Sequence, residues 1–178
     1  MLLNVGDYER EAERVLDPGV FGYFAGGAGD ELTLRDNVEV FSRWQFRPRV
    51  LVDVGEVTTA TTVLGREISM PLLVAPTAFQ RLAHPDGEVA TARAAAEVGT
   101  VMCQSTLSSV TTAELAAAAP GTRLWFQLYW SSDPGFTADL LAGVAEAGFE
   151  AVVFTVDFPA PDAVSATCAR PSRCRRIS

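Results

Sequence analysis

Polar residues follow four short apolar runs, and their side chains are of the types that hydrogen-bond a bound ligand. The four clusters are Pro76-Thr77-Ala78, Ser105-Thr106, Gln127 with Tyr129, and Thr155 with Asp157. Hydroxyl, amide and phenol groups can all donate and accept hydrogen bonds. In β/α folds the ligand sits beyond the carboxyl ends of the strands, so these clusters are the candidate site.

The presence of a single histidine and the absence of lysine exclude several kinds of catalysis. His84 is the only histidine, so one copy of the chain cannot build a metal site that needs two imidazoles, and we expect no metal. All 14 basic residues are arginine, which rules out Schiff-base, P-loop and general-base lysines. A net charge of −8 argues against nucleic-acid or anionic-membrane partners, because phosphate would be repelled.

Composition also bears on where the protein works. The three cysteines show neither metal nor disulfide spacing, which favours a reducing, cytoplasmic compartment. The first residues lack the basic region of a signal peptide. No apolar run approaches about 18 residues, so we expect no membrane span.

From residue 71 onward, apolar strands alternate with helices. The expected strands are Leu72–Ala75, Val101–Gln104, Leu124–Leu128 and Ala151–Val156, and the expected helices cover 85–98, 112–118 and 134–147. Wholly apolar strands between helices are typical of a parallel sheet with helical cover. No strand is followed by a Gly-x-Gly-x-x-Gly fingerprint, and four successive strands end in polar residues. The α/β fold is therefore predicted to be the first half, about four β/α units, of a TIM (β/α)₈ barrel.

The residues before position 71 predict helices rather than sheet. We expect a helix over 7–16 with Asp7 as its N-cap, a short aromatic helix over 20–24, and a third over 30–41. Residues 61–70 could form a small hairpin that turns at Gly65-Arg66.

Six segments in register resemble one known family. They are residues 23–37, 46–54, 70–80, 83–88, 126–129 and 155–159, which include Tyr-Phe-Ala-Gly-Gly-Ala-Gly-Asp-Glu, Phe-Arg-Pro-Arg, Ala-Pro-Thr-Ala-Phe-Gln, Ala-His-Pro-Asp-Gly-Glu, Phe-Gln-Leu-Tyr and Thr-Val-Asp. This pattern is similar to the FMN-dependent 2-hydroxy-acid oxidases and dehydrogenases, such as glycolate oxidase, lactate oxidase and flavin-type L-lactate dehydrogenase. The resemblance implies oxidation of an L-2-hydroxy acid to the 2-oxo acid with FMN as cofactor.

The resemblance also assigns roles. It places Pro76, Thr77 and Ala78 beside the flavin ring, with Ser105, Gln127 and Thr155 hydrogen-bonding the ring's polar edge. It aims the hydroxyls of Tyr23 and Tyr129 at the carboxylate and 2-oxygen of the small substrate. From the residues alone, a structural interpretation stays open: strand-end hydroxyls often cap a helix or satisfy a turn, and either tyrosine could simply pack. His84 precedes a helix and is expected to be structural.

The family's catalytic histidine, its carboxylate-binding arginine and its flavin-facing lysine have no match in this sequence. We therefore expect no catalytic residue here and a chain that is truncated, with residues 1–159 holding the N-terminal helices and half-barrel. Residues 160–178 depart from the family pattern and are expected to be a disordered or frameshifted tail, in which residues 163–178 carry four arginines and no acid.

Three functions stay open. The chain could represent an FMN-dependent oxidoreductase, inactive in isolation, or a non-catalytic remnant that binds flavin. It could also be a half-barrel that pairs with a second copy, as a homo-oligomer, or with a separate second-half chain. The identity of the hydroxy acid and of the electron acceptor is not encoded in the residues present.

Overall fold

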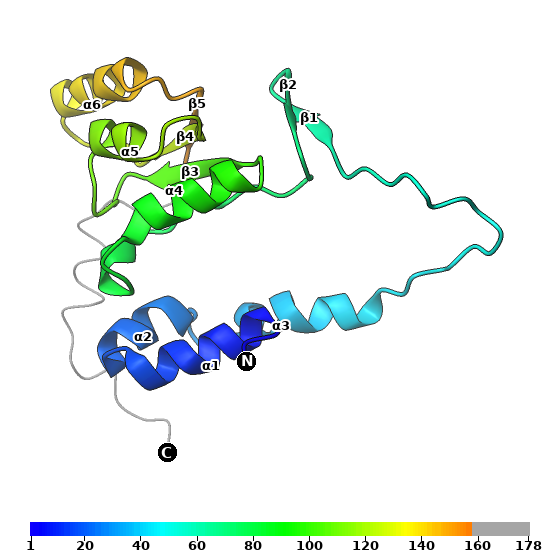
Figure 1. Cartoon of the computed structure of the whole chain (residues 1–178). Helices are drawn as coiled ribbons and strands as arrows, with labels where there is room; N and C mark the ends of the chain where they lie inside the picture. The colour runs from blue at the N-terminus through cyan, green and yellow to red at the C-terminus, as the bar shows by residue number, and fades with distance from the viewer. Residues whose placement is uncertain (158–178) are drawn as a thin grey trace.

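The structure is a computed structural model that describes residues 1–157, so the tail expected at 160–178 lies outside the described residues. Three helices come first along the chain: α1 (Val5–Val15), α2 (Pro18–Ala25) and α3 (Leu32–Glu39), the last continued by a 3₁₀ turn over Val40–Arg43. They lie beside the sheet-containing body in Figure 1. No residue of these three helices is buried within the described part of the chain.

The body is a parallel sheet in which neighbouring strands follow one another in sequence. Its strands are β3 (Val101–Ser105), β4 (Arg123–Leu128) and β5 (Ala151–Phe154), paired in that order. The helices between and before them are α4 (Gly87–Glu97), α5 (Thr112–Ala118) and α6 (Pro134–Glu146). An unreversed strand order is that of a barrel wall, whereas a doubly wound sheet reverses at a switch point. The half-barrel prediction is confirmed.

The core lies between the sheet and its helices. Met102 and Leu124 project from neighbouring strands onto Ala92 of α4 and Leu115 of α5, and all four are buried. A second cluster packs Phe126 and Leu128 of β4 against Val144 of α6. Because strand side chains alternate between faces, the residues in between project to the barrel interior, which carries the candidate site.

Three local predictions were wrong: one strand, one helix N-cap and the position of the hairpin turn. The strand expected over Leu72–Ala75 is reduced to a single parallel bridge between Val74 and Met102. The N-cap of α1 is Asn4 rather than Asp7. The Asn4 side chain accepts from the Asp7 N–H at 3.0 Å while the Asp7 carboxylate accepts from the Asn4 N–H, so the two form a capping box.

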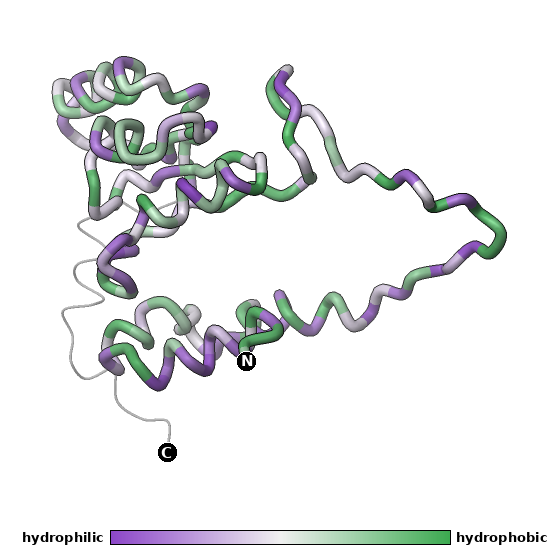
Figure 2. The backbone as a smooth tube through the Cα atoms, in the orientation of Figure 1, coloured by the Kyte–Doolittle hydropathy of each residue, from purple (hydrophilic) through white to green (hydrophobic). Residues whose placement is uncertain are grey.

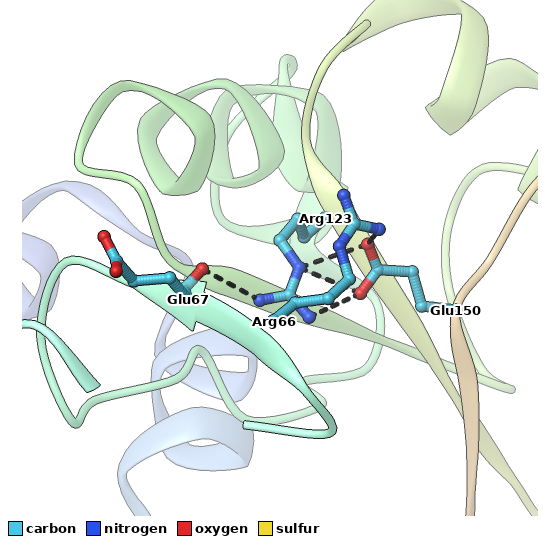
Figure 3. A network of polar contacts seen from close by, with 4 residues as sticks. All are labelled: Arg66, Glu67, Arg123 and Glu150. Carbon is cyan, nitrogen blue, oxygen red and sulfur yellow. Dashed lines mark hydrogen bonds and ion pairs between the residues drawn. The ribbon is translucent and has the colours of Figure 1, made fainter. Parts of the chain in front are cut away.

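The expected hairpin forms from β1 (Thr61–Val63) and β2 (Arg66–Ile68), which are antiparallel. Its turn is at Leu64 and Gly65 rather than at the predicted Gly65-Arg66, because Arg66 already pairs with Val63 in the ladder. Leu64 and Gly65 have positive φ of 50° and 74°, as a two-residue type I′ turn requires. Arg66 and Arg123, which begins β4, both donate to the carboxylate of Glu150 just before β5 (Figure 3). The hairpin is thus attached to the amino-terminal end of the sheet.

An extended segment over residues 44–60 links the N-terminal helices to the hairpin. In Figure 1 it runs away from the body and back, and Figure 2 shows apolar stretches along it. Phe46 and Leu51 on this segment are fully exposed. None of the helices in residues 1–157 is both long and apolar enough to cross a bilayer.

Candidate functional site

A hollow of about 370 Å³ lies at the carboxyl ends of the strands. It is bordered by residues from α2, from the loop after Val74 and from the ends of β3, β4 and β5. These residues are Tyr23, Phe24, Pro76, Thr77, Ala78, Ser105, Gln127, Tyr129 and Thr155. The structure therefore brings all eight residues proposed for the site together around one space; their role in binding stays a prediction.

The amide of Gln127 occupies the centre of the polar wall. The residue is 2% exposed, and its oxygen accepts from the Ser105 hydroxyl at 3.3 Å and from the Thr106 N–H at 3.2 Å. Its nitrogen donates to the Thr155 hydroxyl at 2.8 Å. One side chain thus connects the ends of three adjacent strands, which gives the wall a fixed hydrogen-bonding pattern.

The two hydroxyls beside Gln127 differ in what remains for a ligand. Ser105 donates to Gln127 and accepts the Leu107 N–H at 3.1 Å, so its donor is already committed to the protein. Thr155 accepts from Gln127 through its oxygen, and its own proton can turn toward the hollow. Thr155 therefore suits ligand contact, whereas Ser105 suits the structural role that the sequence left open.

Thr106 was predicted as part of a polar strand end but was assigned no role toward a ligand, and the structure shows that it positions Gln127 and Tyr129. Its hydroxyl donates to the Gln127 carbonyl at 2.6 Å and accepts from the Tyr129 N–H at 3.0 Å. Phe24 was missed, although it borders the hollow next to Tyr23. Adjacency was the available signal, because Phe24 directly follows a predicted site residue in the sequence.

Tyr23 reaches the hollow from α2, outside the barrel wall. Pro18 occupies the first turn of this helix, and the Asp17 carboxylate caps it by accepting from the Gly19 N–H at 2.8 Å. The Tyr23 ring lies 5.1 Å from that of Phe24 and 6.2 Å from that of Phe79. Ring contacts therefore support a side chain that is otherwise half exposed.

The lining of the hollow is electrically neutral within the part of the chain that the structure describes. Within residues 1–157 its lining holds no acidic or basic side chain. His84 lies outside the lining, in an exposed loop before α4, where its Nδ1 accepts from the Asp86 N–H at 3.2 Å. The single histidine thus lies just before a helix, as expected, three residues ahead of the start of α4 at Gly87.

Cys103 lies on the same face of β3 as Ser105, two residues closer to the amino end of the strand. Its thiol is buried, and burial raises the pKa of Cys103 to about 11. Because the thiolate is the reactive form, this group contributes no nucleophile at neutral pH.

The chain matches known proteins over nearly all of its described length. Residues 12–170 match the family model for FMN-dependent dehydrogenase. The chain is 46% identical to "Glycolate oxidase 3" of Oryza sativa subsp. indica and 48% identical to "Glycolate oxidase 1" of Zea mays, each over 89% of its own length. A crystal structure of mandelate oxidase superposes with a TM-score of 0.82 at 45% identity, covering 89% of this chain.

The matches cover less than half of these relatives. The chain spans 43% of the rice protein, 42% of the maize protein and 46% of the mandelate oxidase chain.

Proposed function

The chain belongs to the FMN-dependent dehydrogenase family, and from that premise we propose that its hollow forms one wall of a flavin site for oxidation of a 2-hydroxy acid. One observation supports this most: neutral hydrogen-bonding groups from three adjacent strand ends and two tyrosines border the same space. The relatives are named for glycolate and mandelate, and we extend their shared class, a 2-hydroxy acid, to this chain.

The lining fits the ring of FMN better than its phosphate. Gln127 and Thr155 offer an amide and a hydroxyl suited to the carbonyl and nitrogen edge of a flavin, which protein hydrogen bonds tune. The Pro76–Ala78 segment offers backbone groups beside the ring. A phosphate would require cationic or helix-terminal donors, and within residues 1–157 the hollow has no cationic side chain. The donors for the phosphate must therefore come from groups outside the lining of this hollow.

The proposed reaction removes a hydride from C2 of the hydroxy acid and a proton from its hydroxyl, which leaves the 2-oxo acid. FMN supplies the two-electron acceptor when it is bound. The phenols of Tyr23 and Tyr129 would orient the substrate by donating hydrogen bonds to its carboxylate and 2-oxygen. His84 cannot take the proton from its place outside the lining, so the described residues provide orientation and no general base.

Flavin binding is tested by titrating FMN with the 178-residue chain and following the quenching of flavin fluorescence. Gln127→Leu removes the central amide and is expected to weaken FMN binding at least tenfold. Gln104→Leu is the matched control: this glutamine is equally buried on the neighbouring strand, but it donates to Ser108 and Val110 outside the hollow. Equal loss of binding in both variants would count against the proposed wall.

Turnover is tested by adding glycolate or L-lactate anaerobically to the FMN-loaded chain. We expect the yellow colour to persist, because no general base borders the hollow in residues 1–157. Bleaching by the isolated chain would contradict this assignment of roles.

We propose as a second candidate that the half-barrel binds flavin only together with a partner that supplies further strands. The supporting observation is the outer side of β5, where Val152 and Phe154 are 46% and 51% exposed. FMN binding that appears only after adding such a partner would favour this candidate. A reducing, cytoplasmic location is proposed from the cysteine content alone.

A further inference from the structure

Phe79 adopts a backbone conformation that bulky residues avoid. Its φ of 53° and ψ of 40° lie in the left-handed region, where the side chain crowds the backbone. Such strain persists only where surrounding structure over-determines the conformation, and it gathers at functional sites. Phe79 directly follows the Pro76–Ala78 segment of the hollow.

Hydrogen bonds hold this conformation from both sides. The Phe79 N–H donates to the Leu107 carbonyl at 3.0 Å, and its carbonyl accepts from the Leu82 N–H at 2.9 Å. The next residue, Gln80, donates its N–H to the Glu88 carboxylate at 3.2 Å and its side-chain amide to the Thr77 carbonyl at 3.3 Å. The backbone is therefore fixed before and after the strained residue.

Glu88 anchors this loop from a fully buried position. The same carboxylate oxygen accepts from the Ser109 N–H at 2.8 Å, which joins the loop after Val74 to the loop after β3. Burial alone would raise the pKa of Glu88, but backbone donors from Ser109 and Gln80 outweigh it and lower the pKa. The carboxylate stays ionised at neutral pH and holds both loops.

The ring that this loop presents contacts Tyr23. The two ring centroids are 6.2 Å apart with their planes at 51°, while Phe24 packs edge-on against Tyr23 with centroids 5.1 Å apart. Phe79 does not itself border the hollow. Its ring can affect a ligand through Tyr23, the lining residue that it contacts.

We propose that Phe79 is a positioning residue, whose strained backbone holds its ring against Tyr23 and so fixes the direction of the Tyr23 hydroxyl at the hollow. The consequence for substrate binding rests on the proposed function. The placement of the Tyr23 ring does not, so it can be tested without flavin or substrate.

The experiment uses the full chain labelled with 3-fluorotyrosine and observed by ¹⁹F NMR. The chain has three tyrosines, and Tyr23→Phe identifies the Tyr23 resonance. Phe79→Gly removes the ring but favours the left-handed backbone, whereas Phe79→Leu removes the ring and keeps the strain. Phe46→Gly is the control, because Phe46 is fully exposed on the extended segment.

We expect both Phe79 variants to shift the Tyr23 resonance and leave those of Tyr8 and Tyr129 in place. We also expect Phe79→Gly to melt at a higher temperature than Phe79→Leu, because only glycine relieves the strain. A merely structural ring would give two equally destabilised variants with an unmoved Tyr23 resonance, which would overturn the proposal. Three superimposed resonances in the parent chain would overturn it too, since Tyr23 would then have no fixed surroundings. FMN titration of the same samples reports on the proposed function separately.

Discussion

At the scale of single residues, the site depends on which hydrogen-bonding groups the fold has already used. Gln127 was predicted from its place at the end of an apolar strand, and the sequence could also place hydroxyls at the neighbouring strand ends. It could not say which hydrogen-bonding capacity of each side chain remains for a ligand. That depends on backbone donors, since the Leu107 N–H occupies the Ser105 hydroxyl oxygen and the Thr106 N–H occupies the Gln127 side-chain oxygen. Ser105 and Thr155 therefore differ in their hydrogen bonds within the protein: Ser105 donates to Gln127, whereas Thr155 accepts from it.

Thr155→Val and Ser105→Ala should therefore have different effects. Thr155→Val keeps the shape but removes a hydroxyl that can still donate, so FMN affinity should fall about tenfold, or about 1.4 kcal/mol. Ser105→Ala removes bonds made within the protein and should cost about 1 kcal/mol of unfolding free energy with little change in affinity. FMN titration and urea unfolding measure the two effects. The reverse ranking would show that Ser105 is the ligand contact.

At the scale of elements, strong local signals predicted the helices and tertiary pairing decided the strands. The helix over 112–118 begins and ends where predicted, because Thr111 and Glu114 form a capping box that is readable in the sequence. The strand over 72–75 failed although its residues are apolar. Val74 bonds to Val101 and Cys103 on β3, but the ladder extends no further within the described residues. Strand length depends on the partner, which local composition does not reveal.

The ion pair of Arg123 and Glu150 should make the stability of the hairpin end depend on pH. Hydrogen bonds from Arg123 lower the pKa of Glu150, and the nearby charge of Arg66 adds to the effect. A carboxyl whose folded pKa is lowered stabilises the fold above its ordinary pKa of about 4.3, and this contribution is lost as the pH falls through the lower, folded value. Glu150→Gln should thus cost about 2 kcal/mol at pH 7 and less at pH 3.

Urea unfolding at the two pH values measures this difference. The control is Glu11→Gln, which removes an exposed pair with Arg14 on α1 and should leave the midpoint unchanged. A Glu150→Gln cost that is equal at both pH values would show that packing, rather than charge, is responsible.

At the scale of the whole molecule, the helix-facing face of the sheet is covered over β4 but less so over the edge strand β5. Phe126 and Leu128 of β4 are buried under α6, while their register partners on β5, Val152 and Phe154, are about half exposed. Trp130 packs on Phe154 at 6.1 Å and is itself exposed. An apolar edge strand of this kind is a site for association with another chain.

Phe154→Arg should therefore reduce self-association of the isolated chain several-fold, because a charge on an edge strand opposes pairing. Sedimentation at micromolar concentrations measures the change. Phe46→Arg is the control, because it introduces the same charge in place of an exposed phenylalanine on the extended segment. Equal reduction by both variants would mean that net charge, and not the β5 edge, controls association.

The buried thiol of Cys103 has a use that is independent of any ligand. It lies in the middle strand segment between Met102 and Gln104, both almost fully buried, and its raised pKa keeps it unreactive while the sheet is closed. Once the sheet opens, the pKa returns toward about 8.5 and an alkylating reagent can attack. In a variant with Cys168 and Cys174 replaced by serine, the rate of alkylation would report how often β3 opens. Cys103 is therefore a built-in chemical probe of local unfolding in the half-barrel.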